Sequence, residues 1–209
     1  MDYQRHETAI IEPGAKIGKG TVIKQGAIIR YNATIGENCY IGPYCVIGEP
    51  GEHAEHHNSE KGFDPKGSVS IGDNCRLSER VSIQSPCNGE LTAIGNNCYL
   101  MNGTHVGHDA HLADNVTTAP GTVIGGGAVI HERATLGMNS AVHQRTEVPP
   151  GTILGMLSAF LRSCKPGPWK KVVSAGVVQG WNVIGMERAG MDNEEITDMI
   201  AKQPIIYPQ

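Results

Sequence analysis

Three histidines stand close together in the segment MNGTHVGHDAHLADN, which runs from Met101 to Asn115. They are His105, His108 and His111, and Asp109 directly follows the second of them. Histidine ordinarily titrates near a pH of about 6.5, so one of these side chains could take a proton from a hydroxyl group. Histidines at this spacing could also bind zinc. Which chemistry is possible depends on the elements that position the side chains.

Those elements follow a six-residue repeat. Taken in sixes from residue 9, the chain reads AIIEPG, AKIGKG, TVIKQG, AIIRYN, ATIGEN, CYIGPY and CVIGEP, with Ile third in every block. The period returns at Ile71 and runs again from Ile94 to Phe160, where only Thr118 breaks the series of large apolar residues. A period of six fits neither an α-helix nor an alternating strand, but it is typical of a parallel β-helix. We therefore predict an all-β solenoid with eighteen residues per coil and coils about 4.8 Å apart.

A small residue stands two positions before each apolar one. Four of the six cysteines occupy such positions, namely Cys39, Cys45, Cys75 and Cys98. We interpret these thiols as small buried fillers of the coil, and not as metal ligands or disulfide partners. The 27 glycines and the aromatic content of 5% also favour a turn-rich architecture packed with aliphatic side chains.

Composition excludes several classes of protein. A net charge of −4 argues against a general nucleic-acid binder. No run approaches the roughly 20 apolar residues of a membrane span, and the first residues, MDYQRHETAI, lack the apolar core of a signal peptide. We therefore expect a cytoplasmic protein without a membrane span.

The repeat also predicts the division of the chain. We expect the β-helix over residues 1–165, with loops at 48–67 and 84–92, and a small C-terminal helical extension over 166–209. The first loop contains His53, His56 and His57. In the extension, VVQGWNVIGMERAGM and MDNEEITDMIAK are predicted to be helical, and Asp192 and Glu195 have the spacing of a capping box.

The eighteen-residue coil places the histidines. His108, Gly126 and Gln144 are each one coil apart and should stack at one corner, with His143 on the same edge, while His105 and His111 should point outward. His108 could then act as a general base, and a backbone N–H near Gly126 could stabilise the oxyanion of an acyl-transfer intermediate. Two alternatives stay open. The histidines could be ordinary surface residues, or they could bind zinc as in γ-carbonic anhydrases, where the ligands come from two subunits.

Three segments carry a resemblance to a known family. MNGTHVGHDA, GMNSAVHQ and WNVIGMERAGM…EEITDMI resemble the UDP-N-acetylglucosamine O-acyltransferases of lipid A biosynthesis, over most of the chain from about Ile71 to Tyr207. The resemblance implies a left-handed β-helix and a homotrimer with active sites between subunits. It also implies transfer of an acyl group from acyl carrier protein, or from CoA, to a hydroxyl or amine of a UDP-linked amino sugar. No metal or other cofactor is implied.

The resemblance further implies the roles of single residues. His108 would be the base, Asp109 its partner and Gly126 the oxyanion donor. Contacts with the acyl chain or the UDP-sugar are implied for His105, His143, Gln144, Asn182 and Arg188. Met156 would close the acyl groove early, which implies a donor chain shorter than the longest that the family uses.

This chain also departs from the family. Gly127 replaces a histidine, and Ile184 and Ala189 stand where the family has an acidic and a second basic residue. The loop from His53 to Asp64 does not match the family's acceptor-binding loop. Three other functions therefore remain open from sequence: an acetyl-CoA-dependent sugar acetyltransferase, a metal hydratase and a non-catalytic scaffold. The acceptor sugar and the acylated atom, oxygen or nitrogen, also remain open.

Overall fold

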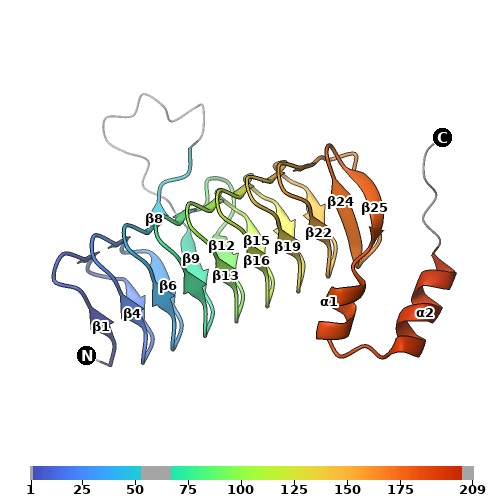
Figure 1. Ribbon diagram of the computed structural model, residues 1–209. Coiled ribbons are helices and arrows are strands. Elements are labelled where there is room, and N and C mark those ends of the chain that lie inside the picture. Colours follow the sequence, from blue (N-terminus) through green and yellow to red (C-terminus); the bar gives the residue numbers. More distant parts are fainter. Residues whose placement is uncertain (1, 53–66, 204–209) are drawn as a thin grey trace.

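The computed structural model describes residues 2–52 and 67–203. Figure 1 shows a regular stack of coils that ends in a hairpin and two short helices. The three faces of the stack are parallel sheets, here named A, B and C, in which each strand pairs with the strand one coil away. The described chain therefore forms a left-handed parallel β-helix with a small C-terminal helical part, and this confirms the predicted fold.

The strands are short, and they follow one another in the order A, B, C around each coil. Sheet A holds β1 (Gln4–Arg5), β4 (Val22–Ile23), β7 (Tyr40–Ile41), β10 (Arg76–Leu77), β13 (Tyr99–Leu100), β16 (Thr117–Thr118), β19 (Thr135–Leu136), β22 (Ile153–Leu154), β24 (Lys170–Val173) and β25 (Val177–Trp181). Sheet B holds β2 (Ile10–Ile11), β5 (Ile28–Ile29), β8 (Val46–Glu49), β11 (Ser82–Gln84), β14 (His105–Val106), β17 (Val123–Ile124), β20 (Ala141–Val142) and β23 (Ala159–Phe160). Sheet C holds β3 (Lys16–Ile17), β6 (Ala33–Ile35), β9 (Ser68–Ile71), β12 (Leu91–Ile94), β15 (His111–Leu112), β18 (Val129–Ile130) and β21 (Glu147–Val148).

The core is the ladder of aliphatic residues that the repeat predicts. Nearly all of these side chains are fully buried, from Ile23 to Phe160. Each contributes roughly 1.5–3 kcal/mol of hydrophobic stabilisation, so a regular ladder suffices without large aromatic residues. Thr118, the exception to the pattern, is also buried, and its hydroxyl lies 2.8 Å from the hydroxyl of Thr104. The two hydroxyl groups satisfy each other inside the coil.

The buried cysteines are fillers of the coil, as predicted. Cys39, Cys45, Cys75 and Cys98 are buried and free. Their thiols hydrogen-bond to backbone carbonyls, as from Cys45 to Ser78 at 2.9 Å, and burial raises the pKa of Cys45 to about 11. The Cys45 thiol is therefore protonated and shielded at neutral pH.

The C-terminal segment differs from the prediction. Residues 177–191 were expected to be helical, but β25 occupies residues 177–181 and pairs antiparallel with β24, while β24 pairs with β22 of the coil. The open edge of sheet A thus acquires two more strands, and the β-branched residues of this segment fit a strand better than a helix. Two helices follow, α1 (Val183–Arg188) and α2 (Asn193–Lys202), and the predicted capping box at Asp192 and Glu195 is confirmed. Because β24 continues sheet A, a unit boundary at residue 165 stays a prediction.

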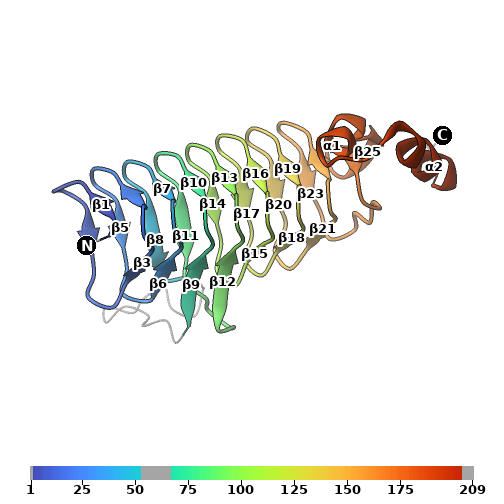
Figure 2. The same cartoon turned by 90° about the horizontal axis from the view of Figure 1, so that it is seen from below.

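The structure describes only one of the two predicted loops in full. Most of the loop at 48–67, including His53, His56 and His57, lies outside the described residues. The second loop is shorter than predicted, since β11 extends to Gln84 and β12 begins at Leu91. Figure 2, seen from below, shows sheet B running the length of the stack. Within residues 2–52 and 67–203, no helix is long and apolar enough to cross a membrane.

Candidate active site

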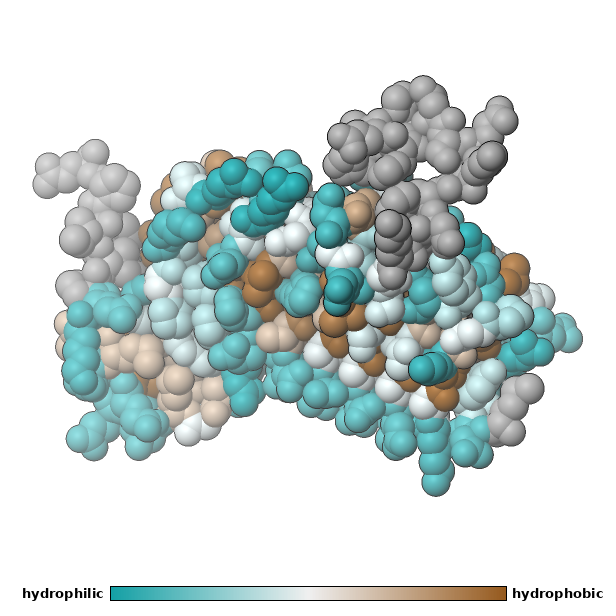
Figure 3. All heavy atoms as spheres, turned by 180° about the vertical axis from the view of Figure 1, so that it is seen from behind, coloured by the Kyte–Doolittle hydropathy of each residue, from teal (hydrophilic) through white to brown (hydrophobic). Residues whose placement is uncertain are grey.

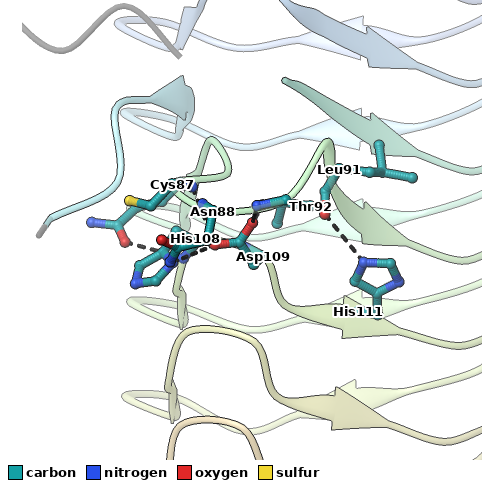
Figure 4. A network of polar contacts seen from close by, with 9 residues as sticks. Cys87, Asn88, Leu91, Thr92, His108, Asp109 and His111 are labelled. Atoms are coloured by element: carbon teal, nitrogen blue, oxygen red, sulfur yellow. Dashed lines mark hydrogen bonds and ion pairs between the residues drawn. The ribbon is translucent and has the colours of Figure 1, made fainter. Parts of the chain in front are cut away.

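His108 and Asp109 lie at the corner between β14 of sheet B and β15 of sheet C, as Figure 4 shows. The Nδ1 atom of His108 lies 2.7 Å from Oδ2 of Asp109, and both side chains are mostly buried. A carboxylate can only accept hydrogen bonds, so Nδ1 of a neutral imidazole carries the proton and donates it. The other ring nitrogen, Nε2, then keeps its lone pair free to accept a proton.

A network of backbone groups holds Asp109 in place (Figure 4). The N–H groups of Cys87 and Asn88 donate to Oδ2 at 3.1 Å each, and that of Gly89 donates to Oδ1 at 2.6 Å. The Asp109 N–H itself donates to the hydroxyl of Thr92 at 2.9 Å. Burial raises the pKa of Asp109, but the hydrogen bonds from His108 and from the three backbone groups outweigh it and hold the pKa below its ordinary value. Asp109 is therefore an ionised anchor that fixes the imidazole.

Sequence reasoning missed the loop groups that hold Asp109. The repeat predicts only that residues 84–92, QSPCNGELT, form a loop. The Asn88–Gly89 pair is a signal for a tight turn. A turn aligns successive backbone N–H groups, but nothing in the sequence indicates which side chain accepts from them.

Gly126 lies one coil beyond His108 and faces its imidazole. A Cβ atom at position 126 would lie 2.5 Å from Nε2 of His108, so only glycine fits beside the ring. The backbone N–H of Gly127 donates to the carbonyl of His108 at 2.8 Å, and that of Arg145 donates to the carbonyl of Gly126 at 2.9 Å. These bonds confirm the predicted stacking of the corner through Gln144. The N–H of Gly126 itself has no acceptor among residues 2–52 and 67–203.

A hollow of about 550 Å³, here named the first hollow, opens over this corner. It is lined by Asn88, Gly89, Glu90, Leu91, His108, Asp109, His111, Gly126, Gly127 and Arg145. The imidazole of His108, the carboxylate of Asp109 and the backbone of Gly126 therefore border one space.

The two flanking histidines point outward, as predicted. His105 on β14 is half-buried, and its Nδ1 lies 2.8 Å from the hydroxyl of Ser82. Burial lowers the pKa of His105 below its ordinary value, and the charge of Glu52 opposes this only in part. His111 on β15 is exposed, and its Nε2 donates to the carbonyl of Leu91 at 3.1 Å. Among the described residues of this single chain, no three His, Cys, Asp or Glu side chains lie close enough to hold a metal ion.

Two further candidates lie one coil beyond Gly126. His143 and Gln144 are both exposed at the same corner, and Nδ1 of His143 donates to the carbonyl of Gln144 at 2.8 Å. The structure thus brings His108, Gly126, His143 and Gln144 to one edge of the prism.

The remaining candidates lie elsewhere. A second hollow, of about 420 Å³, lies on sheet A beside α1 and is lined by Asn115, Thr117, Arg133, Thr135, Ile153, Lys171, Asn182, Ile184, Gly185, Arg188 and Ala189. Asn182 is buried, and its side chain accepts from Gly185 N–H at 3.0 Å and donates to the Gly151 carbonyl at 2.8 Å. It therefore caps α1 and ties the helix to the coil. Met156 is 64% exposed at a third edge, between sheets A and B.

Known proteins match the chain in sequence and in fold. The bacterial transferase hexapeptide family (six repeats) matches residues 14–49 and 92–126. An acyl-[acyl-carrier-protein]–UDP-N-acetylglucosamine O-acyltransferase of Sinorhizobium fredii is 34% identical over 131 residues, which are 62% of this chain and 48% of that protein. The chain thus spans about half the length of the curated relatives that it matches.

Solved structures extend the likeness to nearly the whole fold. A UDP-N-acetylglucosamine acyltransferase from Bacteroides fragilis has a TM-score of 0.79 and 26% identity, over 96% of this chain and 86% of that one. The acyltransferase from Campylobacter jejuni has a TM-score of 0.81 and 24% identity, over 94% and 81% of the two chains, and shares the fold. In sequence and in fold, the chain is similar to UDP-N-acetylglucosamine O-acyltransferases built on hexapeptide repeats.

Proposed function

We propose that the protein is an acyltransferase. It moves an acyl group from a thioester, carried by acyl carrier protein or CoA, to a hydroxyl or amine of a UDP-linked amino sugar. The observation that carries this proposal is the His108–Asp109 pair, whose free ring nitrogen lies against Gly126, a residue whose N–H has no acceptor within the described part of the chain. The relatives named above are acyltransferases of this kind.

The geometry supports a mechanism in two steps. Nε2 of His108 takes the proton of the acceptor hydroxyl while the oxygen of that hydroxyl attacks the carbonyl carbon of the thioester. The oxyanion of the tetrahedral intermediate accepts a hydrogen bond from Gly126 N–H. As the intermediate collapses, the carbon–sulfur bond breaks, and the thiolate takes the proton back from Nε2. Asp109 keeps the ring oriented and stabilises its charged form.

The acceptor's diphosphate fits the second hollow in charge. Three basic side chains line it, those of Arg133, Lys171 and Arg188, and none of the described residues that line it is acidic. Arginine in particular matches the geometry of a phosphate group. In this proposal His105, His143, Gln144, Asn182 and Arg188 contact the acyl chain or the UDP-sugar, and Met156 ends the acyl groove.

The first hollow lies at the edge between sheets B and C and the second lies on sheet A, so we propose a homotrimer in which neighbouring chains combine them. Apolar side chains are exposed along the coils, including Ile10, Val123, Met138 and Met156. Figure 3 shows hydrophobic side chains following the β-helix on one face between hydrophilic ones. A neighbouring copy would bury such surface. The proposal places the enzyme in the cytoplasm, where both substrates would be available, and gives it no metal or other cofactor.

The base assignment is tested by replacing His108 with Ala, with His111→Ala as the matched control, since both histidines line the first hollow. Turnover of a UDP-amino sugar with acyl-carrier-protein and CoA donors should fall at least about 10²-fold for His108→Ala and change little for the control. Turnover of His108→Ala within about threefold of the parent would remove His108 from the mechanism. Zinc that co-purifies with the parent and is lost in His111→Ala would favour the hydratase.

A further inference from the structure

Arg145 occupies a position in the first hollow to which neither the repeat nor the resemblance gives a role. It follows β20 at the same corner as His108, one coil beyond Gly126. Its backbone N–H donates to the Gly126 carbonyl at 2.9 Å, and its side chain lines the hollow together with His108 and Gly126. The backbone of Arg145 is thus anchored to the residue that offers the oxyanion donor.

Gly127 leaves the space that the Arg145 side chain uses. A Cβ atom at position 127 would lie 3.3 Å from Cγ of Arg145, and apart from Gly127 and its two chain neighbours no other described residue has an atom within 4 Å of that point. The φ angle of Gly127 is +65°, which also favours glycine. The aliphatic part of the Arg145 side chain therefore lies against Gly127, and both residues line the hollow.

The charge of Arg145 is not paired with any residue that the structure describes. Two acidic residues, Glu90 and Asp109, also line the hollow, but the Asp109 carboxylate already accepts hydrogen bonds from His108 and from three backbone groups. Across residues 2–52 and 67–203, the Arg145 guanidinium forms no ion pair and no hydrogen bond. A guanidinium stays protonated at all physiological pH values and offers a planar fork of donors that matches phosphate oxygens.

We propose that Arg145 binds a phosphate group of a substrate and holds that substrate over His108 and Gly126. This inference rests on the proposed function, which supplies two sources of the same chemistry: the diphosphate of the nucleotide sugar, and the phosphodiester in the carrier arm of the thioester donor. Arg145 is a binding residue in this role and takes no part in proton transfer. It selects for phosphate-bearing substrates over free sugars or simple thioesters.

The direct test measures binding without turnover. Inorganic pyrophosphate is titrated into the full chain by calorimetry, for the parent, Arg145→Gln and Arg145→Lys. The matched control is Arg80→Gln, because Arg80 is also an exposed arginine at a coil corner, with a φ of +59° against +54° for Arg145, and it lines neither hollow. Each titration is repeated with Arg188→Gln added, so that pyrophosphate bound in the second hollow does not mask the change.

We expect the Kd of pyrophosphate to rise about tenfold in Arg145→Gln, to rise less in Arg145→Lys, and to stay unchanged in Arg80→Gln. An unchanged Kd in Arg145→Gln, or no binding of pyrophosphate by the parent, would overturn the inference. This measurement does not depend on the reaction, so it stands or fails separately from the proposed function.

Steady-state kinetics then identify the source of the phosphate. A higher KM of Arg145→Gln for the nucleotide sugar at unchanged kcat assigns Arg145 to the acceptor, and a higher KM for the thioester assigns it to the donor. A loss of kcat with both KM values unchanged contradicts a binding role. If the parent turns over no UDP-amino sugar with any thioester, the proposed function fails, and the pyrophosphate titration still decides whether Arg145 binds the anion.

Discussion

Replacing Gly126 with Ala should disable the site by a single methyl group. The added Cβ would lie 2.5 Å from Nε2, 2.6 Å from Cε1 and 2.9 Å from Cδ2 of His108. Ordinary contacts between such atoms are about 3.5–4.0 Å, so the ring must retreat by about 1 Å. It cannot do so freely, because Nδ1 is held at 2.7 Å by Asp109. The retreat therefore breaks either the bond to Asp109 or the alignment of Nε2 with the substrate.

The size of the effect follows from this displacement. A misplacement of about 1 Å in a catalytic group costs roughly 10²-fold in rate, so kcat/KM should fall by about 10²–10³-fold. Stability should hardly change, since φ at Gly126 is not among the positive values and the new methyl group lies outside the core.

The assay compares kcat/KM and Tm of Gly126→Ala with those of Gly180→Ala. Gly180 is the matched control, because a Cβ atom there meets nothing within 4 Å and its φ is not among the positive values either. Activity of Gly126→Ala within threefold of the control, at equal Tm, would falsify the argument that the imidazole must sit against the Gly126 backbone.

Three further predictions concern other parts of the molecule. The lowered pKa of Asp109 contributes stability that is present above the unfolded value of 3.8 and is lost as the pH falls through the folded value. In Asp109→Asn, Tm should therefore fall less steeply than in the parent as the pH is lowered through this range. A Tm that falls as steeply in the variant as in the parent would contradict this prediction. Asn182→Ala should lower the free energy of unfolding by about 0.5–2 kcal/mol through loss of the α1 cap, and an unchanged Tm would show that the cap is dispensable. Met156→Gly should shift the preference toward longer acyl donors, because each buried methylene is worth about 0.8 kcal/mol, and an unchanged chain-length profile would refute the groove-end role.

The sequence predicts the fold and the stacking of residues at the corner of His108, because both follow from the fixed six-residue period. Parallel pairing without register shifts keeps residues eighteen apart in neighbouring coils, as His105 and Val123 show. The position of His108 above Gly126 and Gln144 therefore follows from counting. The position of a residue cannot be predicted in this way where the six-residue period ends, because no strand register then relates that part of the chain to the coil.

The features that escaped prediction lie at such places. The loop that donates Cys87, Asn88 and Gly89 N–H groups to Asp109 leaves the coil and returns, and its path depends on contacts made only in the folded chain. The hairpin of β24 and β25 forms because sheet A has an open edge there, and the two valines at residues 177 and 178 are too weak a local signal to separate strand from helix by sequence alone. Asn182 was expected to contact substrate through the resemblance alone, whereas its buried cap depends on the position of Gly151.

A last prediction follows from where the candidate residues lie. His108 stands between sheets B and C, whereas Arg188 lines a hollow on sheet A. The parallel register holds these positions apart in one chain, so a site that uses both must take them from two copies. Chains carrying His108→Ala and chains carrying Arg188→Gln should each be inactive as homotrimers, three chains of 22.3 kDa by sedimentation. Refolded together at equal amounts, they should recover up to about one quarter of the parent's activity, because one pairing of neighbours in four joins an intact His108 to an intact Arg188. If the mixture stays inactive while subunit exchange is complete, each chain builds its own site, and the division of the site between neighbours is wrong.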